Sequence, residues 1–170
     1  MKIGIHFLIY FLLLLSFPSI AKTGFVNTMR AFEQTHQGKA VKARLEKESK
    51  KAQSELTKLE SQLKKEEESL KKEVALLSEQ AKNAKLTQFQ RRVFEFQKKA
   101  KDEEIRLQNL QKELMDPILN RLKVVIGDVA KKAGYSVVKN IGNDILWVSA
   151  NLDLTDQVYT AYNKKYKRKI

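Results

Sequence analysis

Cysteine is absent from the 170 residues, and proline, glycine, tryptophan and histidine are scarce. Without cysteine the chain can form neither a disulfide bond nor a thiolate-based metal or catalytic site. The sequence has only two histidines, no glycine-rich phosphate loop, and no acidic or histidine cluster with metal-ligand spacing. We therefore expect a protein that is not an enzyme and that uses no cofactor and no metal.

The first 21 residues have the layout of a cleavable secretory signal. Lys2 precedes an apolar run over residues 3–17, Pro18 breaks this run, and Ser19 and Ala21 place small side chains before a predicted cleavage after Ala21. The apolar run is shorter than the roughly 20 residues needed to span a bilayer. An uncleaved membrane anchor is the alternative. An exported chain without disulfides must be stabilised by packing or by oligomerisation.

Basic residues outnumber acidic ones by 33 to 20, which gives a formal net charge of +13. Cleavage would remove one Lys and no acidic residue, so the mature chain would carry +12. Such a charge predicts an anionic partner: a membrane surface, lipopolysaccharide, an acidic polypeptide or nucleic acid. Export argues against nucleic acid, so we expect no nucleic-acid partner and disfavour a DNA-compacting role.

Residues 38–115 form a stretch rich in Lys, Glu, Gln, Leu and Ala in which apolar residues recur every seven positions, as in a coiled coil. The first run occupies its two seam positions with Leu45, Ala52 and Leu59, and with Leu56, Leu63, Leu70 and Leu77. A polar gap follows, and the pattern resumes from Leu86 to Leu114. We interpret the gap as the tip, near residues 78–87, of an antiparallel helical hairpin. One uninterrupted helix in a parallel coiled coil is the alternative.

The flanking segments, residues 22–37 and 116–170, predict a small body of mixed structure. Stretches near 23–27, 135–139 and 144–148 favour β-structure and indicate one strand plus a hairpin. Pro117 marks a helix start or a kink, and we expect a last helix at about residues 154–162. The predicted fold class is therefore α+β, with a small β-containing oligomerisation body that carries a long antiparallel helical-hairpin (coiled-coil) arm.

A body of this size is marginally stable alone, so we expect it to oligomerise. The candidate residues for the oligomerisation body are Val26, Phe32, Leu146 and Trp147. Ordinary packing within the chain's own core is the alternative for Phe32 and Trp147.

Segments of the body and the start of the arm resemble the Skp/OmpH family. Residues 25–32 are similar to its opening strand and turn, and residues 38–46 to the start of its first arm helix. Residues 133–138, 145–148 and 153–158 resemble its terminal hairpin and helix. The resemblance implies a periplasmic homotrimer whose three arms enclose unfolded outer-membrane β-barrel proteins without ATP. It also implies a basic lipopolysaccharide site on the arm.

The arm offers two sets of candidate binding residues. An excess of positive charge lies towards the predicted tip, where we expect clients or an anionic surface to bind Lys82, Lys85, Arg91, Arg92, Lys98, Lys99 and Lys101. Phe94 and Ile105 lie off the seam, 11 residues apart and thus on nearly one helical face, and could form a weak apolar contact strip for clients. For the single lysines the alternative is an ordinary solvated surface, and for the strip it is packing between arms.

Glu66 and Glu73 occupy seam positions in the distal arm. We expect them opposite Lys98/Lys99 and Arg91/Arg92, respectively. A charged seam residue lowers coiled-coil stability, so the distal arm should splay more easily than the proximal arm.

The sequence thus favours an ATP-independent holding chaperone for unfolded outer-membrane proteins. The alternative is a structural envelope coiled-coil protein that binds anionic membrane or lipopolysaccharide.

Overall fold

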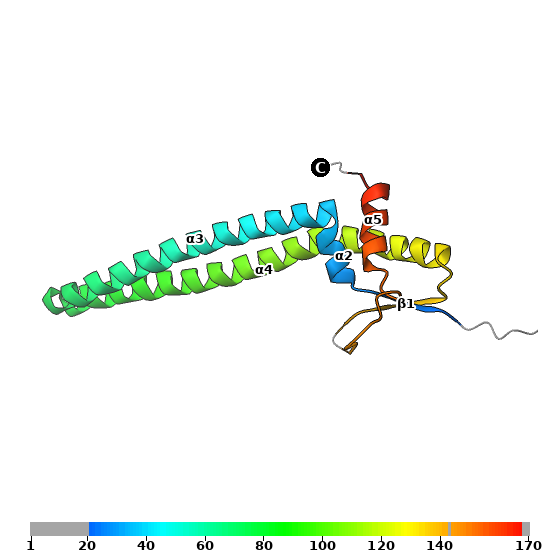
Figure 1. Cartoon of the computed structure of the whole chain (residues 1–170). Coiled ribbons are helices and arrows are strands. Elements are labelled where there is room, and N and C mark those ends of the chain that lie inside the picture. The colour runs from blue at the N-terminus through cyan, green and yellow to red at the C-terminus, as the bar shows by residue number, and fades with distance from the viewer. Residues whose placement is uncertain (1–20, 143, 168–170) are drawn as a thin grey trace, which may run out of the picture.

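The computed structural model describes residues 21–142 and 144–167, so most of the predicted signal, residues 1–20, lies outside it. A long hairpin of two helices projects from a small body that contains both ends of the described chain (Figure 1). The elements are, in order, β1 (Thr23–Val26), α2 (Thr28–Gln34), α3 (His36–Glu73), the 3-10 turn η1 (Val74–Leu76), α4 (Glu79–Lys132), β2 (Val137–Asn140) and α5 (Thr155–Lys165).

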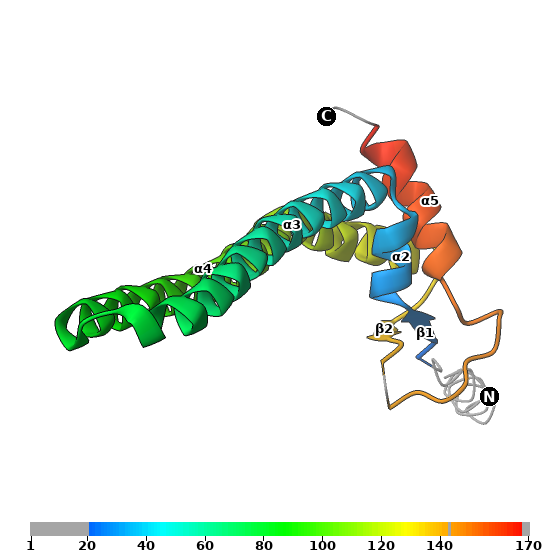
Figure 2. The ribbon, with the colours of Figure 1, turned by 90° about the vertical axis from the view of Figure 1, so that its left-hand side faces the viewer.

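The arm consists of α3 and the first part of α4, which run antiparallel along their shared length (Figures 1 and 2). Side-chain caps begin both helices: Thr35 Oγ1 accepts the Gly38 N–H at 2.8 Å, and Ser78 Oγ accepts the Ala81 N–H at 3.4 Å. The predicted antiparallel hairpin on a small β-containing body is confirmed.

The reversal lies nearer the N-terminus than predicted. Helix α3 ends where the Val74 N–H bonds the Leu70 carbonyl, and Leu77 is extended with φ −96° and ψ 153°. Residues 79–87, part of the predicted tip, are helical. Ser78 acts as an N-cap with Glu79 in the first turn of α4, and both favour a helix start at this point. The polar gap in the heptads is therefore mostly the first turns of α4.

Helix α4 runs without a break through Pro117 into the body, so of the two predictions for this residue, a helix start or a kink, the helix start is wrong. Proline lacks the N–H that would bond the carbonyl of Glu113, four residues earlier. Pro117 and Glu113 are both exposed, which lets water satisfy this carbonyl. The single helix α4 thus serves both as one of the two helices of the arm and as the centre of the body.

The core of the body forms where α4 meets α2, β1 and α5. Leu122 and Val125 of α4 are buried against side chains from both ends of the chain, among them Val26, Phe32 and Tyr162. Val26 and Phe32, predicted for the oligomerisation body, therefore lie in the chain's own core, which for Phe32 is the alternative given above.

A hydrogen-bond network holds the arm root to α5 beside this core. The Tyr162 hydroxyl donates to Gln37 Oε1 at 2.6 Å, and Arg121 Nη1 donates to the same oxygen at 3.2 Å. Gln37 lies in the first turn of α3, Arg121 in α4 and Tyr162 in α5. The network therefore joins three helices at the point where the arm leaves the body.

The sheet is not the predicted hairpin. Strand β1 pairs in parallel with β2, from Thr23 opposite Val137 to Val26 opposite Asn140. On its other edge β1 bonds the segment before α5: the Phe25 N–H donates to Leu152 O and the Leu154 N–H to Phe25 O, each at 2.8 Å. Both edges of β1 are thus occupied, and the predicted strand at 144–148 is an extended loop without a strand partner in the described chain.

Among the described residues, no helix is long and apolar enough to cross a membrane, and no group of three or more His, Cys, Asp or Glu side chains could hold a metal ion.

Candidate functional site

The seam of the arm is built from half-buried leucines and phenylalanines that α3 and α4 direct at each other. Ala52 is the one seam residue of α3 that is buried, and the other seam residues of the described arm keep partial exposure. A two-helix hairpin cannot enclose its apolar seam as a globular core does. The arm therefore presents shallow apolar surface along its whole length.

Ion pairs cross the seam at four levels. Near the body Arg106 bonds Glu48 at 3.3 Å, and further out Lys99 lies 3.7 Å from Glu55. In the distal arm the cross-seam partners are Arg92 with Glu66, and Lys85 with Glu73. These side chains are partly exposed, so the pairs set the register of the two helices more than they stabilise the arm.

The distal pairs differ in register from the prediction by one heptad. Glu66 faces Arg92 instead of Lys98/Lys99, and Glu73 faces Lys85 instead of Arg91/Arg92. The reversal begins at residue 74, a few residues earlier than predicted. In an antiparallel hairpin, moving the reversal by one residue changes the number of the residue that faces a given position by two.

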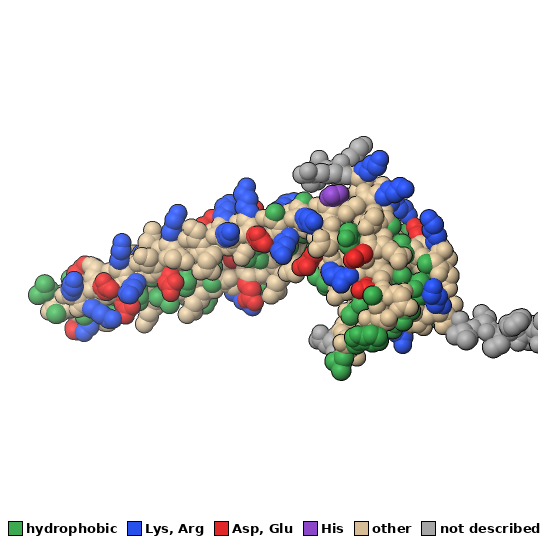
Figure 3. Space-filling view, in the orientation of Figure 1, with side chains coloured by type: hydrophobic (Ala, Val, Ile, Leu, Met, Phe, Trp, Pro, Cys, Tyr) green, Lys and Arg blue, Asp and Glu red, His purple; other side chains and the backbone are tan. Residues whose placement is uncertain are grey.

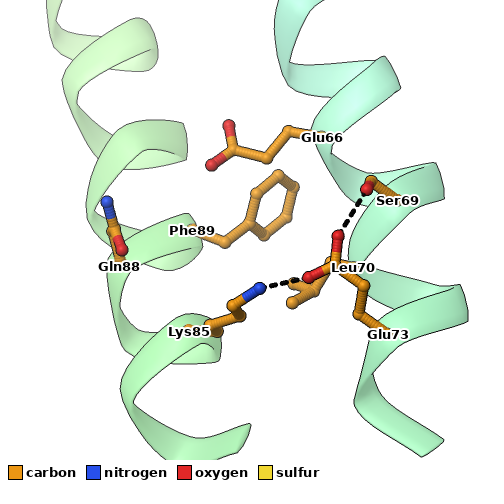
Figure 4. Close-up of a pocket in the computed structure, with 7 residues that line it drawn as sticks. All are labelled: Glu66, Ser69, Leu70, Glu73, Lys85, Gln88 and Phe89. Carbon is orange, nitrogen blue, oxygen red and sulfur yellow. Dashed lines mark hydrogen bonds and ion pairs between the residues drawn. The ribbon is translucent and has the colours of Figure 1, made fainter. Parts of the chain in front are cut away.

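Glu73 lies at the centre of the most distal cluster (Figure 4). Its carboxylate accepts hydrogen bonds from Lys85 Nζ and, at 2.7 Å, from Ser69 Oγ. The bond from Lys85, followed by that from Ser69, holds the pKa of Glu73 below its ordinary value. Together with Glu66 and Phe89 these groups line an open cavity of about 200 Å³.

A second cavity, of about 290 Å³, lies nearer the body and is lined by Leu59, Leu63, Arg92 and Phe96 among others. Both cavities flank the seam where phenylalanines replace leucine on α4. The distal arm therefore carries two open grooves beside a seam that contains Glu66 and Glu73. That the distal arm splays more easily than the proximal arm stays a prediction.

The predicted basic residues do not form one patch at the tip. They extend along α4 from its first turn to near the middle of the arm, and six of the seven are in ion pairs. Lys82 pairs with Glu79, Arg91 with Glu95, and Lys101 with Glu104, in addition to the three cross-seam pairs. For Lys98 the described residues provide no ion-pair partner. These pairs reduce the charge available to an anionic ligand.

Phe94 and Ile105 are exposed, as the sequence predicts. Phe94 keeps 66% and Ile105 44% of its surface accessible. On a helix, residues 91, 98 and 101 fall on the same side as Phe94. Phe94 and Ile105, together with the basic residues on the same side of α4, therefore form an exposed strip. We call this strip the arm strip (Arg91, Phe94, Lys98, Lys101 and Ile105).

The body has its own exposed apolar residues. Leu146 is 98% and Trp147 80% exposed in the loop between β2 and α5, and Val124 and Val137 are also exposed. The outer edge of β2 has no strand partner in the described chain. Exposed large apolar side chains and an unpaired sheet edge are each typical of a surface that another chain covers.

The heptad pattern does not predict the apolar reversal at the end of the arm. Leu76 is 89% exposed there. The heptad pattern places Leu77 in the seam and predicts helix over residues 74–76. The run Val74-Ala75-Leu76-Leu77, in which three apolar residues outside the heptad positions precede the seam residue Leu77, is the signal that could have identified the reversal.

Comparison with known protein families gives a match over residues 22–162 to the family described as outer membrane protein (OmpH-like). The chain belongs to this OmpH-like family. The match begins at Lys22, directly after the predicted cleavage site, and includes the arm, both strands and most of α5. No curated protein matches the chain.

A solved structure shares the OmpH-like fold. It is that of a protein from Caulobacter crescentus CB15, described as a candidate outer membrane chaperone (OmpH-like). The two share 20% sequence identity, with a TM-score of 0.72, and the alignment covers 91% of this chain and 90% of the other. At this identity the likeness establishes the fold, including the long arm, and not the ligand.

Proposed function

We propose that this OmpH-like protein is a periplasmic holding chaperone that binds unfolded outer-membrane proteins and prevents their aggregation without ATP. The observation that carries the proposal is the arm itself: a long projecting hairpin with a half-exposed apolar seam and an exposed arm strip. A small-molecule ligand would need a concave pocket that encloses most of its surface. An unfolded chain, which has no fixed shape, is better held by many weak contacts spread over a long surface.

The family and the fold support this proposal. The chain is OmpH-like, and a structure with the same fold is described as a candidate outer membrane chaperone. The N-terminal residues have the layout of a secretory signal, from which we propose export and cleavage after Ala21. We propose that the protein works without a cofactor and catalyses no reaction.

We further propose that the body assembles three chains. Leu146 and Trp147 expose large apolar side chains in the loop that follows β2, and β2 has no strand partner on its outer edge in the described chain. A second chain could cover both features by pairing with β2. Three arms around one axis would enclose a client from several sides, and each arm would contribute its own arm strip.

The arm strip is the site to test. Phe94→Ser with Ile105→Ser removes its apolar surface without touching the seam, so the arm should still fold. Aggregation of a urea-unfolded outer-membrane β-barrel protein on dilution, followed by light scattering, should require several-fold more of this variant than of the wild type. Thr87→Ala with Gln108→Ala, exposed on the same helix, is the matched control. If the strip variant suppresses aggregation as well as the control, the strip is not the client contact.

The second candidate function is a structural envelope protein that binds anionic membrane or lipopolysaccharide. The excess of basic residues favours it: residues 64–99 contain ten basic and six acidic side chains. The ion pairs described above weaken this case, because most of the bases have a carboxylate partner. Such a protein would bind lipopolysaccharide in a salt-sensitive manner and leave the aggregation of unfolded chains unchanged.

A further inference from the structure

The proposed cleavage site lies directly beside the sheet of the body. Cleavage after Ala21 would make Lys22 the first residue of the mature chain, and β1 begins one residue later, at Thr23. The Lys22 carbonyl accepts the Ser136 N–H at 2.8 Å and the Val137 N–H at 3.3 Å. The residue that follows the scissile bond is therefore already hydrogen-bonded to the start of β2.

The side chain of Lys22 is held as well. Its ammonium nitrogen lies 4.0 Å from the centre of the Tyr135 ring, which is a favourable distance for a cation–π contact. Tyr135 is itself buried, and its hydroxyl donates to the Asn151 carbonyl at 3.0 Å. The start of the mature chain is thus fixed by residues from the far end of the sequence.

Both edges of β1 are in use, which leaves no free backbone for a protease. A protease that binds its substrate as an added strand pairs with the backbone N–H and C=O groups around the scissile bond. In the folded body, β1 pairs with β2 on one side and with Leu152 and Leu154 on the other. A signal peptidase can therefore take up the residues after Ala21 only when β1 detaches.

The topology delays the pairing of β1. Its partners, β2 and the segment before α5, both follow the arm in the sequence. In a chain exported from its N-terminus, β1 has no partner until the arm has crossed the membrane. Contacts so distant in sequence also form more slowly than the local contacts of a helical hairpin. The arm projects from the side of the body opposite the start of the described chain, so folding of the arm leaves the cleavage site free (Figures 1 and 3).

We propose that the fold sets the order of two events: the bond between Ala21 and Lys22 is hydrolysed before β1 joins the sheet. Water is the co-reactant, and the products are the Ala21 carboxylate and the Lys22 α-ammonium group. The inference rests on the export and cleavage proposed above, and not on client holding. A chain that folds before it is cut hides its own cleavage site and keeps its signal.

The full-length precursor, residues 1–170, tests this order. It is unfolded in urea and diluted into detergent micelles that contain purified signal peptidase, either at once or after refolding without the enzyme. Mass spectrometry then measures the initial rate of cleavage after Ala21. The refolded precursor should be cut more slowly by roughly tenfold or more, because cleavage then requires β1 to open. Equal rates would overturn the proposal.

Amide hydrogen exchange shows whether β1 has docked in the uncut chain. The amides to follow are those of Ser136 and Val137, whose acceptor is the Lys22 carbonyl. Protection of both amides in the refolded precursor identifies it as the folded state for the comparison. If they become protected only after cleavage, the proposed order holds in a stricter form, since the attached signal then keeps β1 from docking.

A precursor with the segment Lys-Thr-Gly-Ser-Gly-Ser inserted after Ala21 is the matched control. It keeps Lys and Thr after the scissile bond and moves this bond away from the sheet. The insertion variant should be cut at the same rate whether or not it has refolded. If the refolded native precursor is cut as fast as the refolded insertion variant, the sheet does not protect the site and the proposal is wrong.

Substitutions at Ser136, which is exposed, test the hydrogen bond itself. Ser136→Pro removes the N–H that bonds the Lys22 carbonyl, and Ser136→Ala retains it. The refolded Ser136→Pro precursor should be cut several-fold faster than the refolded Ser136→Ala precursor. Equal rates for the two variants would contradict the proposed protection.

The outcomes separate this inference from the proposals that precede it. If signal peptidase does not cut the unfolded precursor after Ala21, the proposed cleavage site and the proposed order are both wrong. If it cuts there equally fast in both states, the cleavage site stands and the order is wrong. Client holding is measured on the mature chain and depends on neither result.

Discussion

The joint between arm and body should be intolerant of a single added methyl group at Gly38. A Cβ built at Gly38 would lie 1.9 Å from the Phe32 carbonyl oxygen and 2.8 Å from Thr35 Oγ1. The first of these contacts is with backbone, so no side-chain rotation relieves it. Gly38→Ala must therefore move the first turn of α3 away from α2.

The cost of this movement has two parts. Overpacking of a buried site costs about 1–3 kcal/mol. The displaced turn also weakens the cap in which Thr35 Oγ1 accepts the Gly38 N–H at 2.8 Å and donates to Phe32 O at 2.8 Å, and loss of an N-cap costs about 1 kcal/mol. Gly38→Ala should therefore lower the free energy of unfolding by about 2–4 kcal/mol in all.

Circular dichroism during urea and thermal unfolding of the mature chain measures this loss. Gly127→Ala is the matched control, because no side chain and no other element lies within 4 Å of a Cβ built at Gly127 near the C-terminal end of α4. The control should raise stability by about 0.5–1 kcal/mol, as alanine favours a helix interior more than glycine does. Equal stability of Gly38→Ala and the wild type would refute the close packing of α3 against α2 at Gly38.

Three further predictions concern the arm and the body. Glu66→Leu with Glu73→Leu replaces the charged seam residues, so amide hydrogen exchange in the distal arm should slow and the range of client sizes that the protein holds should narrow. An unchanged range of client sizes in a stiffened arm would contradict the link between arm flexibility and client holding. Acidification should loosen the arm end: the folded-state pKa of Glu73 is lowered, so its stabilising contribution is present above the unfolded value, near 4.5, and is lost as pH falls below it. The protection of amides at residues 66–92 against exchange, relative to the intrinsic exchange rate at the same pH, should then fall at acid pH more in the wild type than in Glu73→Gln. Leu146→Ser with Trp147→Ser should shift the molar mass towards one chain in multi-angle light scattering, and a trimer that persists at micromolar concentration would place the interface elsewhere.

The hairpin was predictable because its information is local. Each leucine in the heptad pattern specifies its own face of a helix, and antiparallel pairing follows once the chain reverses. The reversal lies earlier in the sequence than the heptad pattern predicts, because Ser78 is the N-cap of α4 and not part of a longer turn. That error moved every expected ion-pair partner by one heptad, as Glu66 with Arg92 shows.

The body was harder to predict because its contacts are distant in sequence. The β-propensity of residues 144–148 is real, but propensity does not specify a partner. Val26 pairs with Asn140, although the whole arm lies between these two residues in the sequence. Phe25 forms its backbone hydrogen bonds on the other edge with Leu152 and Leu154, just before α5. Likewise, composition cannot distinguish Phe32, buried in the core, from Trp147, exposed on a loop. Only the assembled fold separates them.

We propose that this OmpH-like chain holds unfolded outer-membrane proteins, and one experiment tests this directly. The direct measurement dilutes a urea-unfolded outer-membrane β-barrel protein into buffer with the mature chain, residues 22–170, and no nucleotide, and then determines scattering and the mass of the soluble complex. The account predicts suppressed aggregation near one trimer per client and a complex of three chains plus one client. Unhindered aggregation, with the added protein eluting alone, would contradict it.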